Sequence, residues 1–371
     1  MTRSAVAARR RVLYYAHQHG AGHVHHARTL MGADAFDVTV VTAHPRAVAM
    51  LPDGADVVPL PSDLVDGHLQ PAGSALHWTP VGPQIQQRFG TLLAASQRVQ
   101  PDVVVVDVSV EAALFLRLAG YPVIHRRMHG DRTDAAHQLL YAEMDALVAY
   151  YGAGLEDPGW LEQYGQKTVN LGTPDVTGRL SERAGTAQRL DSAAVPRIAV
   201  VTGTGGGGVR LTDLARAAQQ VPAAQWEVYG PVVEPQTAPT PPNLALHGWT
   251  DSVAARLAEA DLVVVSAGHN ASVDAVRSGR PLVLAPEVRP FDEQLRFAQA
   301  AQAQAGVPWC AWADPGADWA GAVRTALADP AAADRLAAQM LTEPGEHRRR
   351  WEELVDRVVG SAGGSPSDQP A

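Results

Sequence analysis

The chain has 371 residues, of which 46% are hydrophobic and 19% charged, and its formal net charge is −9. This length suits two domains, and this composition is typical of folded globular proteins rather than disordered ones. The negative charge argues against a nucleic-acid partner, and the single cysteine, Cys310, fits a reducing compartment. No apolar run approaches the roughly 18 residues of a membrane span, and VLYYA is too short for a signal peptide, so a cytoplasmic protein is expected.

Strand-like apolar runs alternate with helical patterns through the first half of the chain. These runs are RVLYYA (11–16), FDVTVVTA (36–43), ADVVPL (55–60), PDVVVVDVS (101–109), YPVIHRR (121–127), DALVAYY (145–151) and QKTVNLG (166–172). The four valines of the fourth run show no alternation of apolar and polar residues. That pattern predicts a strand buried on both faces of a parallel sheet.

The second half repeats this alternation of strands and helices. Its strand-like runs are PRIAVVTG (196–203), WEVYG (226–230), LALHG (244–248), DLVVVS (261–266) and PLVLAP (281–286). Strands that alternate with helices predict an α/β fold with two doubly wound domains. In such domains ligands bind at the carboxyl ends of the strands, which predicts a site in a cleft between the two halves.

Changes in composition predict the domain boundaries. The first domain is expected over 1–180 and the second over 196–340, joined by a small, polar, proline-containing linker at 181–195. An amphipathic helix over 341–360 either stays solvated or packs back on the first domain. The Gly/Ser/Pro-rich tail 361–371 is expected to be disordered.

The segment HQHGAGHVHHAR (17–28) follows the first strand and holds five histidines. Such a cluster can hold a metal ion or transfer protons near neutral pH. Three of its histidines, at positions 23, 25 and 26, resemble the start of an HxHxDH metal-binding motif. Ala27 and Arg28 stand where the aspartate and the last histidine of that motif would be. No metal site is therefore expected.

A glycine-rich turn, VVTGTGGGGVRL (200–211), joins a strand to a helix. Small residues let backbone N–H groups approach an anion, and the helix N-terminus adds partial positive charge. The glycines fit the spacing of a dinucleotide-binding turn, but WEVYG ends the next strand in glycine where an acid would bind ribose. A nicotinamide-dependent oxidoreductase is therefore disfavoured, and a plain tight turn remains the alternative.

The segment SAGHNASVDAVRSGRPLVLAPEVRPFDEQLRFAQ (266–299) carries a more specific pattern. A buried strand ends at Ser266, a turn with Gly268 follows, and a helix begins near Asn270. Asn270 and Ser272 either cap this helix or donate to a phosphate, and Asp274 can bind ribose hydroxyls. Residues 292–294, expected on a loop, are the carboxylate and amide groups that recognise sugar hydroxyls. Each residue alone has an ordinary role as a cap or loop residue, but their order and spacing together favour a nucleotide-sugar site.

Taken together, these motifs resemble the donor-site signature of the GT-B glycosyltransferases, G-x-N-S/A-T/S-x-E/D…G-x-P…P…D-x-Q. The chain is similar both to the UDP-sugar transferases and to the peptidoglycan lipid-intermediate N-acetylglucosaminyltransferase. HGAGHVHHA resembles the first-strand loop of the family and TGTGGGG its glycine loop, so the resemblance covers nearly the whole chain. It implies two Rossmann-like domains facing across a cleft, the first binding the acceptor and the second the nucleotide-sugar donor.

The resemblance also implies roles for individual residues. His23 is the general base, and Asp107, at the end of the fourth strand, orients it. The implied donor-binding residues are Gly203, Thr204, Gly205, Gly206, Trp249, Ser266, Gly268, His269, Asn270, Ser272, Asp274, Asp292, Glu293 and Gln294. The acceptor-side residues are Gly20, Gly22, His19 and Arg126, while His25 and His26 are acceptor-side or structural.

The sequence departs from the family pattern at three positions. Ser266 stands where the donor box has a histidine, so one phosphate ligand is lost or replaced by His269. Asp274 replaces the commoner glutamate and reaches less far toward ribose. His26 stands where proline is usual, so the start of the first helix is expected to differ.

The activity expected from the resemblance is that of an inverting, metal-independent glycosyltransferase of the hexosyltransferase type. It moves a sugar from a UDP or TDP sugar to a hydroxyl of a small or lipid-linked acceptor, without a cofactor. The basic triplet Arg9–Arg11 allows at most peripheral membrane contact. Two alternatives remain open: a sugar-nucleotide hydrolase of the same fold, and a nucleotide-sugar-binding protein without catalysis. The GTRPE opening of a non-hydrolysing 2-epimerase is absent.

Overall fold

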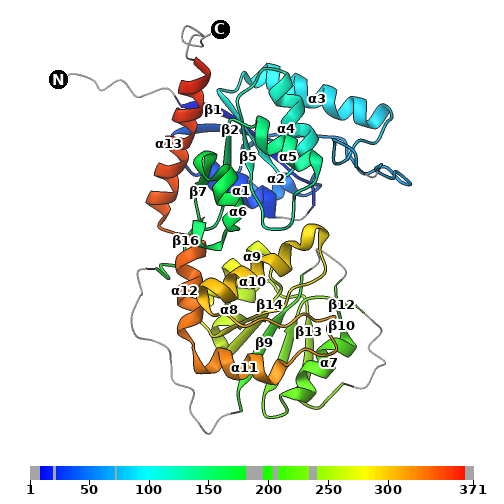
Figure 1. Ribbon diagram of the computed structural model, residues 1–371, viewed down its shortest axis with the longest axis vertical. Helices are drawn as coiled ribbons and strands as arrows, with labels where there is room; N and C mark the ends of the chain where they lie inside the picture. Colours follow the sequence, from blue (N-terminus) through cyan, green and yellow to red (C-terminus); the bar gives the residue numbers. More distant parts are fainter. Residues whose placement is uncertain are drawn as a thin grey trace, which may run out of the picture.

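The computed structural model describes residues 9–19, 22–71, 73–180, 195–203, 208–233 and 240–363. Two parallel sheets, each covered by helices, form two bodies that stack along the long axis of the molecule (Figure 1). Every run predicted as a strand, from 11–16 to 281–286, overlaps a strand of one of these sheets. The predicted α/β class with two doubly wound units is therefore confirmed.

The first sheet has seven parallel strands in the order β3-β2-β1-β4-β5-β6-β7. Its strands are β1 (Arg10–Ala16), β2 (Phe36–Thr42), β3 (Asp56–Pro59), β4 (Val103–Asp107), β5 (Val123–Arg126), β6 (Ala146–Ala149) and β7 (Thr168–Asn170). The chain runs outward from β1 through β2 to β3, then returns to β4 on the other side of β1. The carboxyl ends of β1 and β4 thus form the switch point where a doubly wound sheet opens a crevice.

Helices cover both faces of this sheet. They are α1 (Gly22–Met31), α2 (Ala47–Met50), α3 (Pro83–Val99), α4 (Val110–Leu118), α5 (Ala135–Glu143) and α6 (Pro158–Tyr164), with short 3₁₀ turns η1 (Ala153–Leu155) and η2 (Gly165–Lys167). Alternate residues of β1 enter different apolar clusters, Tyr14 with α1 on one face and Tyr15 with α3 and α4 on the other. The four valines of β4 have no exposed area, which confirms that this strand is buried on both faces.

The second sheet has five parallel strands in the order β13-β11-β9-β14-β15. They are β9 (Arg197–Val201), β11 (Gln225–Tyr229), β13 (Leu244–Gly248), β14 (Leu262–Val265) and β15 (Leu282–Leu284). A small separate pair joins β10 (Val209–Arg210) to β12 (Val232–Val233). The switch point here lies between β9 and β14, so Gly203 and Ser266 follow the two strands that border it.

Six helices and one turn accompany the second sheet: α7 (Leu211–Gln220), α8 (Val253–Glu259), α9 (His269–Ser278), η3 (Pro290–Asp292), α10 (Glu293–Ala305), α11 (Trp319–Ala328) and α12 (Ala331–Met340). One sequence prediction is wrong in this region. Glu293 and Gln294, expected on a loop, are the first two residues of α10. The loop ends before them, with Phe291 at φ 62° and Asp292 at φ 51°, both in the left-handed region.

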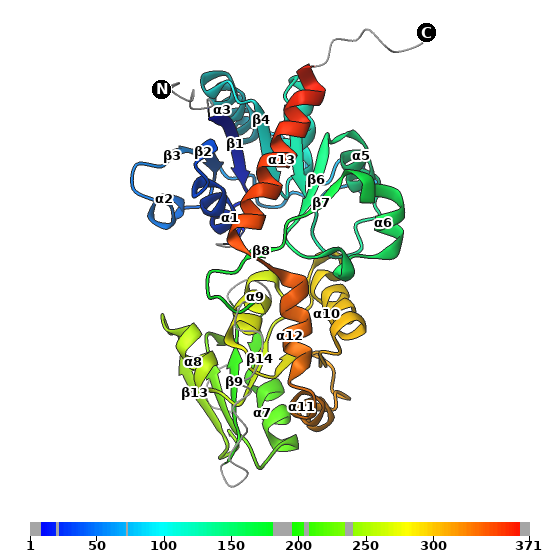
Figure 2. The same ribbon diagram turned by 90° about the vertical axis from the view of Figure 1, so that its left-hand side faces the viewer.

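After the second sheet the chain crosses back to the first. β16 (Leu341–Thr342) pairs with β8 (Thr173–Pro174), and α13 (Pro344–Gly363) then lies along the first body (Figure 2). Trp351, Leu354 and Val355 of α13 are buried in the same apolar cluster as β1. Among the residues that the structure describes, no helix is long and apolar enough to cross a membrane.

Candidate active site

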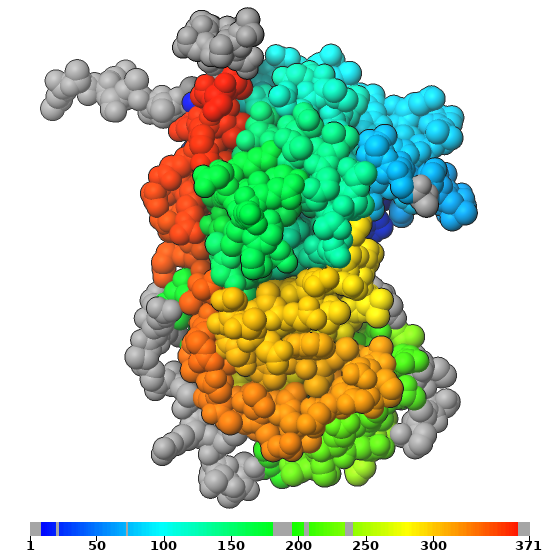
Figure 3. All heavy atoms as spheres, in the orientation of Figure 1, coloured from blue at the N-terminus to red at the C-terminus, as the bar shows by residue number. Residues whose placement is uncertain are grey.

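A cleft of about 2080 Å³ lies between the carboxyl edges of the two sheets. Its first wall comes from the β1–α1 turn and from α3, α4 and α5, and its second wall from the start of α9, the residues around η3 and Trp249. In the space-filling view the first body rests on the yellow segments that include α9 and α10 (Figure 3). The switch points of the two sheets therefore face one another, where ligands of doubly wound folds bind.

His23 and Asp107 meet at the floor of the first wall. Asp107 is the last residue of β4, and His23 is the second residue of α1, the helix that follows β1 along the chain. The Nδ1 atom of His23 lies 3.0 Å from Oδ1 of Asp107, whose side chain is fully buried. The sequence implied this pair from a family resemblance, and the fold brings it together because β1 and β4 are neighbours.

Two further groups hold the Asp107 carboxylate. Nη1 of Arg126, at the end of β5, donates to Oδ1 over 3.0 Å, and the Tyr14 hydroxyl donates to Oδ2 over 3.1 Å. The hydroxyl of Tyr150 lies 3.3 Å from that of Tyr14. Sequence reasoning missed both tyrosines: Tyr14 lies in β1, which precedes the histidine segment, and Tyr150 directly follows β6. Arg126, assigned to the acceptor side, has a side chain only 7% exposed and lies beside the carboxylate.

The charge of Asp107 follows from these contacts. Burial is the largest influence on its pKa and would raise it, but Arg126 and His23 together outweigh burial and hold the pKa well below its usual range. An ionised carboxylate only accepts hydrogen bonds, so the proton on His23 belongs on Nδ1. The Nε2 lone pair of the neutral ring is then free to accept a proton.

The other histidines of the segment 17–28 lie in different environments. Burial, followed by the neighbouring His23 and His19, lowers the pKa of His17 to about 3, so this ring is neutral. His19 stacks on His17 with ring centres 4.9 Å apart. His26 is buried and stacks on Tyr150 at 3.9 Å, which agrees with the structural alternative, whereas His25 is exposed on α1. Among the described residues, no three acidic, histidine or cysteine side chains are grouped as metal ligands would be.

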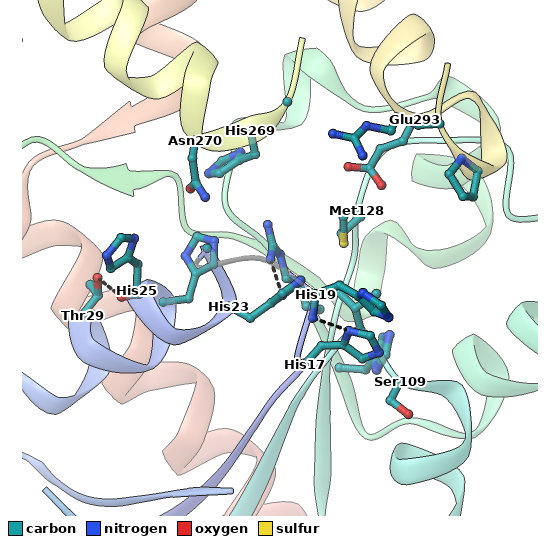
Figure 4. Close-up of a pocket in the computed structure, with 18 of the residues that line it drawn as sticks. His17, His19, His23, His25, Thr29, Ser109, Met128, His269, Asn270 and Glu293 are labelled. Atoms are coloured by element: carbon teal, nitrogen blue, oxygen red, sulfur yellow. Dashed lines mark hydrogen bonds between the residues drawn. The ribbon is translucent and has the colours of Figure 1, made fainter. Parts of the chain in front are cut away.

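On the second wall, the start of α9 faces His23 across the cleft (Figure 4). The helix begins at His269 with Gly268 as its N-cap, and none of the described side chains caps it. The alternative that Asn270 or Ser272 caps the helix is therefore wrong. Ser272 is fully buried, and its hydroxyl has no hydrogen-bond partner among the described residues. The uncapped backbone N–H groups leave this end of α9 free to bind an anion.

Two side chains that were predicted to bind the donor form hydrogen bonds with other residues of the chain. Nε2 of His269 lies 3.0 Å from the Thr173 hydroxyl. Burial and then Arg126 lower the pKa of His269 well below its usual value, so this neutral ring brings no positive charge to a phosphate. Gln294 is buried, and its Oε1 accepts from the backbone N–H of Glu287 over 2.9 Å.

Other assigned residues lie open to the cleft or outside its lining. Trp249 is 71% exposed, and Asp274 has a side chain 55% exposed on α9. Both line the cleft, as do Ser266, Gly268, Gly203 and Asn270. Asp292 is not part of the cleft lining. The predictions for Gly20, Thr204, Gly205 and Gly206 lie outside the described residues.

The two walls touch at both sides of the cleft. A Cβ added at Gly22 would overlap the side-chain amide of Asn270, so α1 and α9 approach closely here and a larger residue would require Asn270 to shift. On the other side, the N–H of Asp131 donates to the Phe291 carbonyl over 2.7 Å. Arg132 pairs with Glu293 over 3.0 Å, so the assigned sugar ligand Glu293 contacts the opposite body. No sequence motif signalled these contacts.

Comparison with known proteins shows which solved structures share this architecture. No protein-family model matches the sequence, and no curated protein sequence is detectably similar to it. Solved structures, in contrast, match it over nearly its whole length. The spinosyn forosaminyltransferase SpnP is 18% identical with a TM-score of 0.64, over 94% of this chain and 100% of its own.

Two further glycosyltransferases give similar matches. The spinosyn rhamnosyltransferase SpnG, complexed with thymidine diphosphate, is 17% identical with a TM-score of 0.60, over 92% of this chain and 100% of its own. MurG of Acinetobacter baumannii is 14% identical with a TM-score of 0.57, over 95% of this chain and 99% of its own. The chain has the GT-B fold. In this GT-B fold, the His23–Asp107 pair and the start of α9 face one another across the cleft between the bodies.

Proposed function

We propose that this GT-B protein is a glycosyltransferase that moves a sugar from a UDP or TDP sugar to an acceptor hydroxyl, with inversion at the anomeric carbon. The observation that carries the proposal is the buried His23–Asp107 pair at the switch point of the first sheet. It faces the uncapped start of α9 across the cleft. A base on one wall and an anion site on the other are what a single displacement at a sugar phosphate requires.

The donor is assigned to the second body, residues 196–340, and the acceptor to the first, residues 1–180. The backbone N–H groups after Gly268 point toward the diphosphate, Asp274 is within reach of the ribose, and Trp249 lies beside the base. All three residues line the cleft. SpnG, which has the same fold, binds thymidine diphosphate, and this supports a nucleoside diphosphate as the ligand.

His23 acts as the general base. Its Nε2 takes the proton from the acceptor hydroxyl while that oxygen forms a bond to the anomeric carbon. The bond from this carbon to the diphosphate oxygen breaks on the opposite face, through a transition state with oxocarbenium character. Asp107 holds the Nδ1 proton and stabilises the imidazolium that forms.

The charge that develops on the leaving diphosphate is stabilised by the N-terminus of α9. Among the described residues no side chain caps this helix, so its first backbone N–H groups and the helix dipole together favour an anion there. Because this stabilisation needs no cation, the reaction is proposed to be independent of metal ions. EDTA is then expected to leave the rate of transfer unchanged within twofold, and strong inhibition would contradict this part of the proposal.

The acceptor is assigned to the part of the cleft between α3 and α4. Ile85 and Phe89 of α3 line this part together with Leu114 and Phe115 of α4. An apolar lining of this kind suits an acceptor with a hydrophobic body, whether a small molecule or a lipid-linked one. Its hydroxyl would reach His23 at the floor of the cleft.

The first test is the thermal unfolding of the purified protein with UDP, TDP, GDP, ATP and NAD. A ligand at about 100 times its dissociation constant stabilises the folded state by roughly 2.7 kcal/mol, which is a measurable rise in Tm. The proposal expects stabilisation by UDP or TDP and none by NAD. Stabilisation by NAD alone, or by none of the five, would contradict it. Release of free sugar from the donor without any acceptor would favour the hydrolase alternative.

A further inference from the structure

The environment of the His23–Asp107 pair contains a cation that a pair of this kind does not require. Nη1 of Arg126 lies 3.0 Å from Oδ1 of Asp107, the same oxygen that accepts from His23. It also lies 3.4 Å from Nδ1 of His23. Nδ1 carries the proton that bonds Asp107, and a guanidinium only donates. The short distance from Arg126 to His23 is therefore an approach of two donors, not a hydrogen bond.

Arg126 is held in this position from several sides. Its guanidinium lies over the ring of Tyr150, 5.1 Å from the ring centre, and its side chain is 7% exposed. Burial makes the charge of Arg126 costly, and Asp107 compensates this cost most directly. An arginine that served only to bind an acceptor would project into the cleft. Arg126 does line the cleft, but Nη1 of its guanidinium is directed at the Asp107 carboxylate and lies next to Nδ1 of His23.

Other titratable groups face His23 from each neighbouring element. They are His17 and His19 at the end of β1, His26 on α1, His44 after β2, Asp107 on β4 and Arg126 on β5. The pKa values of His17, His26 and His44 are lowered, in each case chiefly by burial, so these rings are neutral near pH 7. Arg126 and Asp107 are thus the fixed charges closest to the His23 ring.

A buried carboxylate alone would favour the protonated form of the histidine beside it. Such a histidine binds a proton more tightly, so a smaller fraction of the rings is free to act as a base at a given pH. A cation beside the same carboxylate has the opposite effect on the ring. At these distances in a buried site the two effects are of comparable size.

We propose that Arg126 is a positioning residue of the His23–Asp107 pair, which fixes the carboxylate and, through its charge, keeps the imidazole in its unprotonated form. This inference rests on the proposed function, in which His23 accepts a proton. When His23 is neutral, the group formed by His23, Asp107 and Arg126 carries no net charge. It becomes +1 only when His23 takes up the proton from the acceptor. The positive charge then arises at the moment when the diphosphate leaves, on the facing wall of the cleft.

The experiment is an NMR titration of the folded protein with histidine labelled at Cε1. A His23→Gln variant identifies the His23 signal, because this signal alone is lost. In Arg126→Gln the side-chain amide can still donate to Asp107, but the charge is removed. We expect the titration midpoint of His23 to rise by about one pH unit, a tenfold gain in proton affinity. Arg126→Lys, which keeps the charge, should leave the midpoint within about 0.3 units of the wild type.

Arg28→Gln is the matched control. Arg28 is an exposed cation on the same helix as His23, and solvent screens such charges. Its removal should leave the midpoint of His23 unchanged. An unchanged midpoint in folded Arg126→Gln would overturn the proposal, as would an equal rise in Arg126→Gln and Arg28→Gln.

A second pair of variants covers the case in which Arg126→Gln does not fold. Asp107→Asn and the double variant Asp107→Asn/Arg126→Gln remove the buried carboxylate, so the loss of Arg126 leaves no unpaired charge. The midpoint of His23 should be higher in the double variant than in Asp107→Asn alone. Equal midpoints in these two variants would refute the proposal.

The pH profile of the reaction gives a separate readout. In Arg126→Gln the acid limb of kcat/KM should move to higher pH by the same amount as the NMR midpoint, with KM for the donor unchanged. If the protein transfers no sugar, the proposed function fails, yet the titration still decides the role of Arg126. A rise in acceptor KM with an unmoved midpoint would instead make Arg126 an acceptor ligand.

Discussion

At the residue level, burial gives neighbouring histidines of one segment different chemistry. His17 is partly buried and His26 is buried, and among the described residues neither has a carboxylate within hydrogen-bond distance. Burial lowers both pKa values far enough to keep the rings neutral. The Nδ1 atom of His23, six positions after His17, lies 3.0 Å from the Asp107 carboxylate. The sequence showed five similar side chains, and their partners in space distinguish them.

The substitution His23→Gln tests the proposed base directly. Glutamine fills a similar volume but cannot accept the proton, so we expect kcat to fall by about 10²–10⁴-fold. The affinity for UDP or TDP should stay within twofold, because His23 lies on the wall opposite the start of α9. Single-turnover kinetics and calorimetric titration measure the two quantities. Transfer at more than a tenth of the wild-type rate would remove His23 from this role.

At the level of elements, the first turns of α9 present three different surfaces. Gly268 caps the helix without a side-chain bond, Asn270 points toward Gly22 of the opposite body, and Ser272 is turned into the core. Asp274 lies one turn further on and is open to the cleft. The helical period of 3.6 residues explains why residues so close in sequence cannot all serve one ligand.

The substitution Asp274→Ala tests the placement of the ribose. Loss of a charged acceptor for a ribose hydroxyl should weaken the binding of the nucleoside diphosphate by about tenfold, or about 1.4 kcal/mol. Calorimetric titration gives the dissociation constant. The control is Asp314→Ala, which removes an exposed carboxylate of the second body that does not line the cleft. Equal affinities for wild type and Asp274→Ala would show that the ribose binds elsewhere.

At the level of the whole molecule, the end of the chain stabilises its beginning. Trp351 of α13 is 1% exposed and packs in the apolar cluster of the first sheet. The first body therefore contains a helix that follows the second body in sequence. Together with the ion pair of Arg132 and Glu293, this crossover links the two walls of the cleft.

The substitution Trp351→Ala should destabilise the first body through the loss of buried apolar surface and the cavity that remains. Large-to-small replacements of this kind cost about 3–5 kcal/mol. Urea unfolding followed by circular dichroism measures the free energy of unfolding. Arg357→Ala, at an exposed position of the same helix, should change it by less than about 0.5 kcal/mol. A similar small effect of both substitutions would mean that α13 contributes little to the first core.

Buried histidines also make the stability of the whole molecule depend on pH. Burial is the chief cause that lowers the pKa of His17 and His125 to about 3, and that of His129, His137 and His347 to about 4. In the unfolded chain a histidine titrates near 6.5, so below that pH the unfolded state binds more protons than the folded state. The stabilisation is therefore complete above about pH 6.5 and is lost progressively as the pH falls toward 3–4.

Between pH 7 and pH 5.5 these groups should lower the free energy of unfolding by about 3–6 kcal/mol. Urea titrations monitored by tryptophan fluorescence at several pH values give this dependence. His347→Leu removes one of the five groups and should make the dependence weaker by one proton. Constant stability from pH 7 to pH 5.5 would contradict the assignment of neutral buried rings.

The sequence by itself determined the alternation of strands and helices, the two doubly wound sheets and the segments that border the cleft. These features depend on local patterns: apolar runs such as 103–106, glycine turns after strands, and helical periodicity. The rule that ligands bind at the carboxyl ends of parallel strands then placed the histidine segment and Gly268 at one cleft. The fold class could therefore be predicted from residues that are close together in the sequence.

Only the tertiary structure decided which charged groups meet. Arg126 reaches His23 from 103 positions away, and Glu293 reaches Arg132 across 161 positions, in the opposite body. The packing of α13 in the apolar cluster of β1 likewise joins residues that lie far apart in the sequence. Such contacts leave no periodic trace, because a buried arginine beside a carboxylate and a solvated arginine at the end of a strand look the same in a sequence.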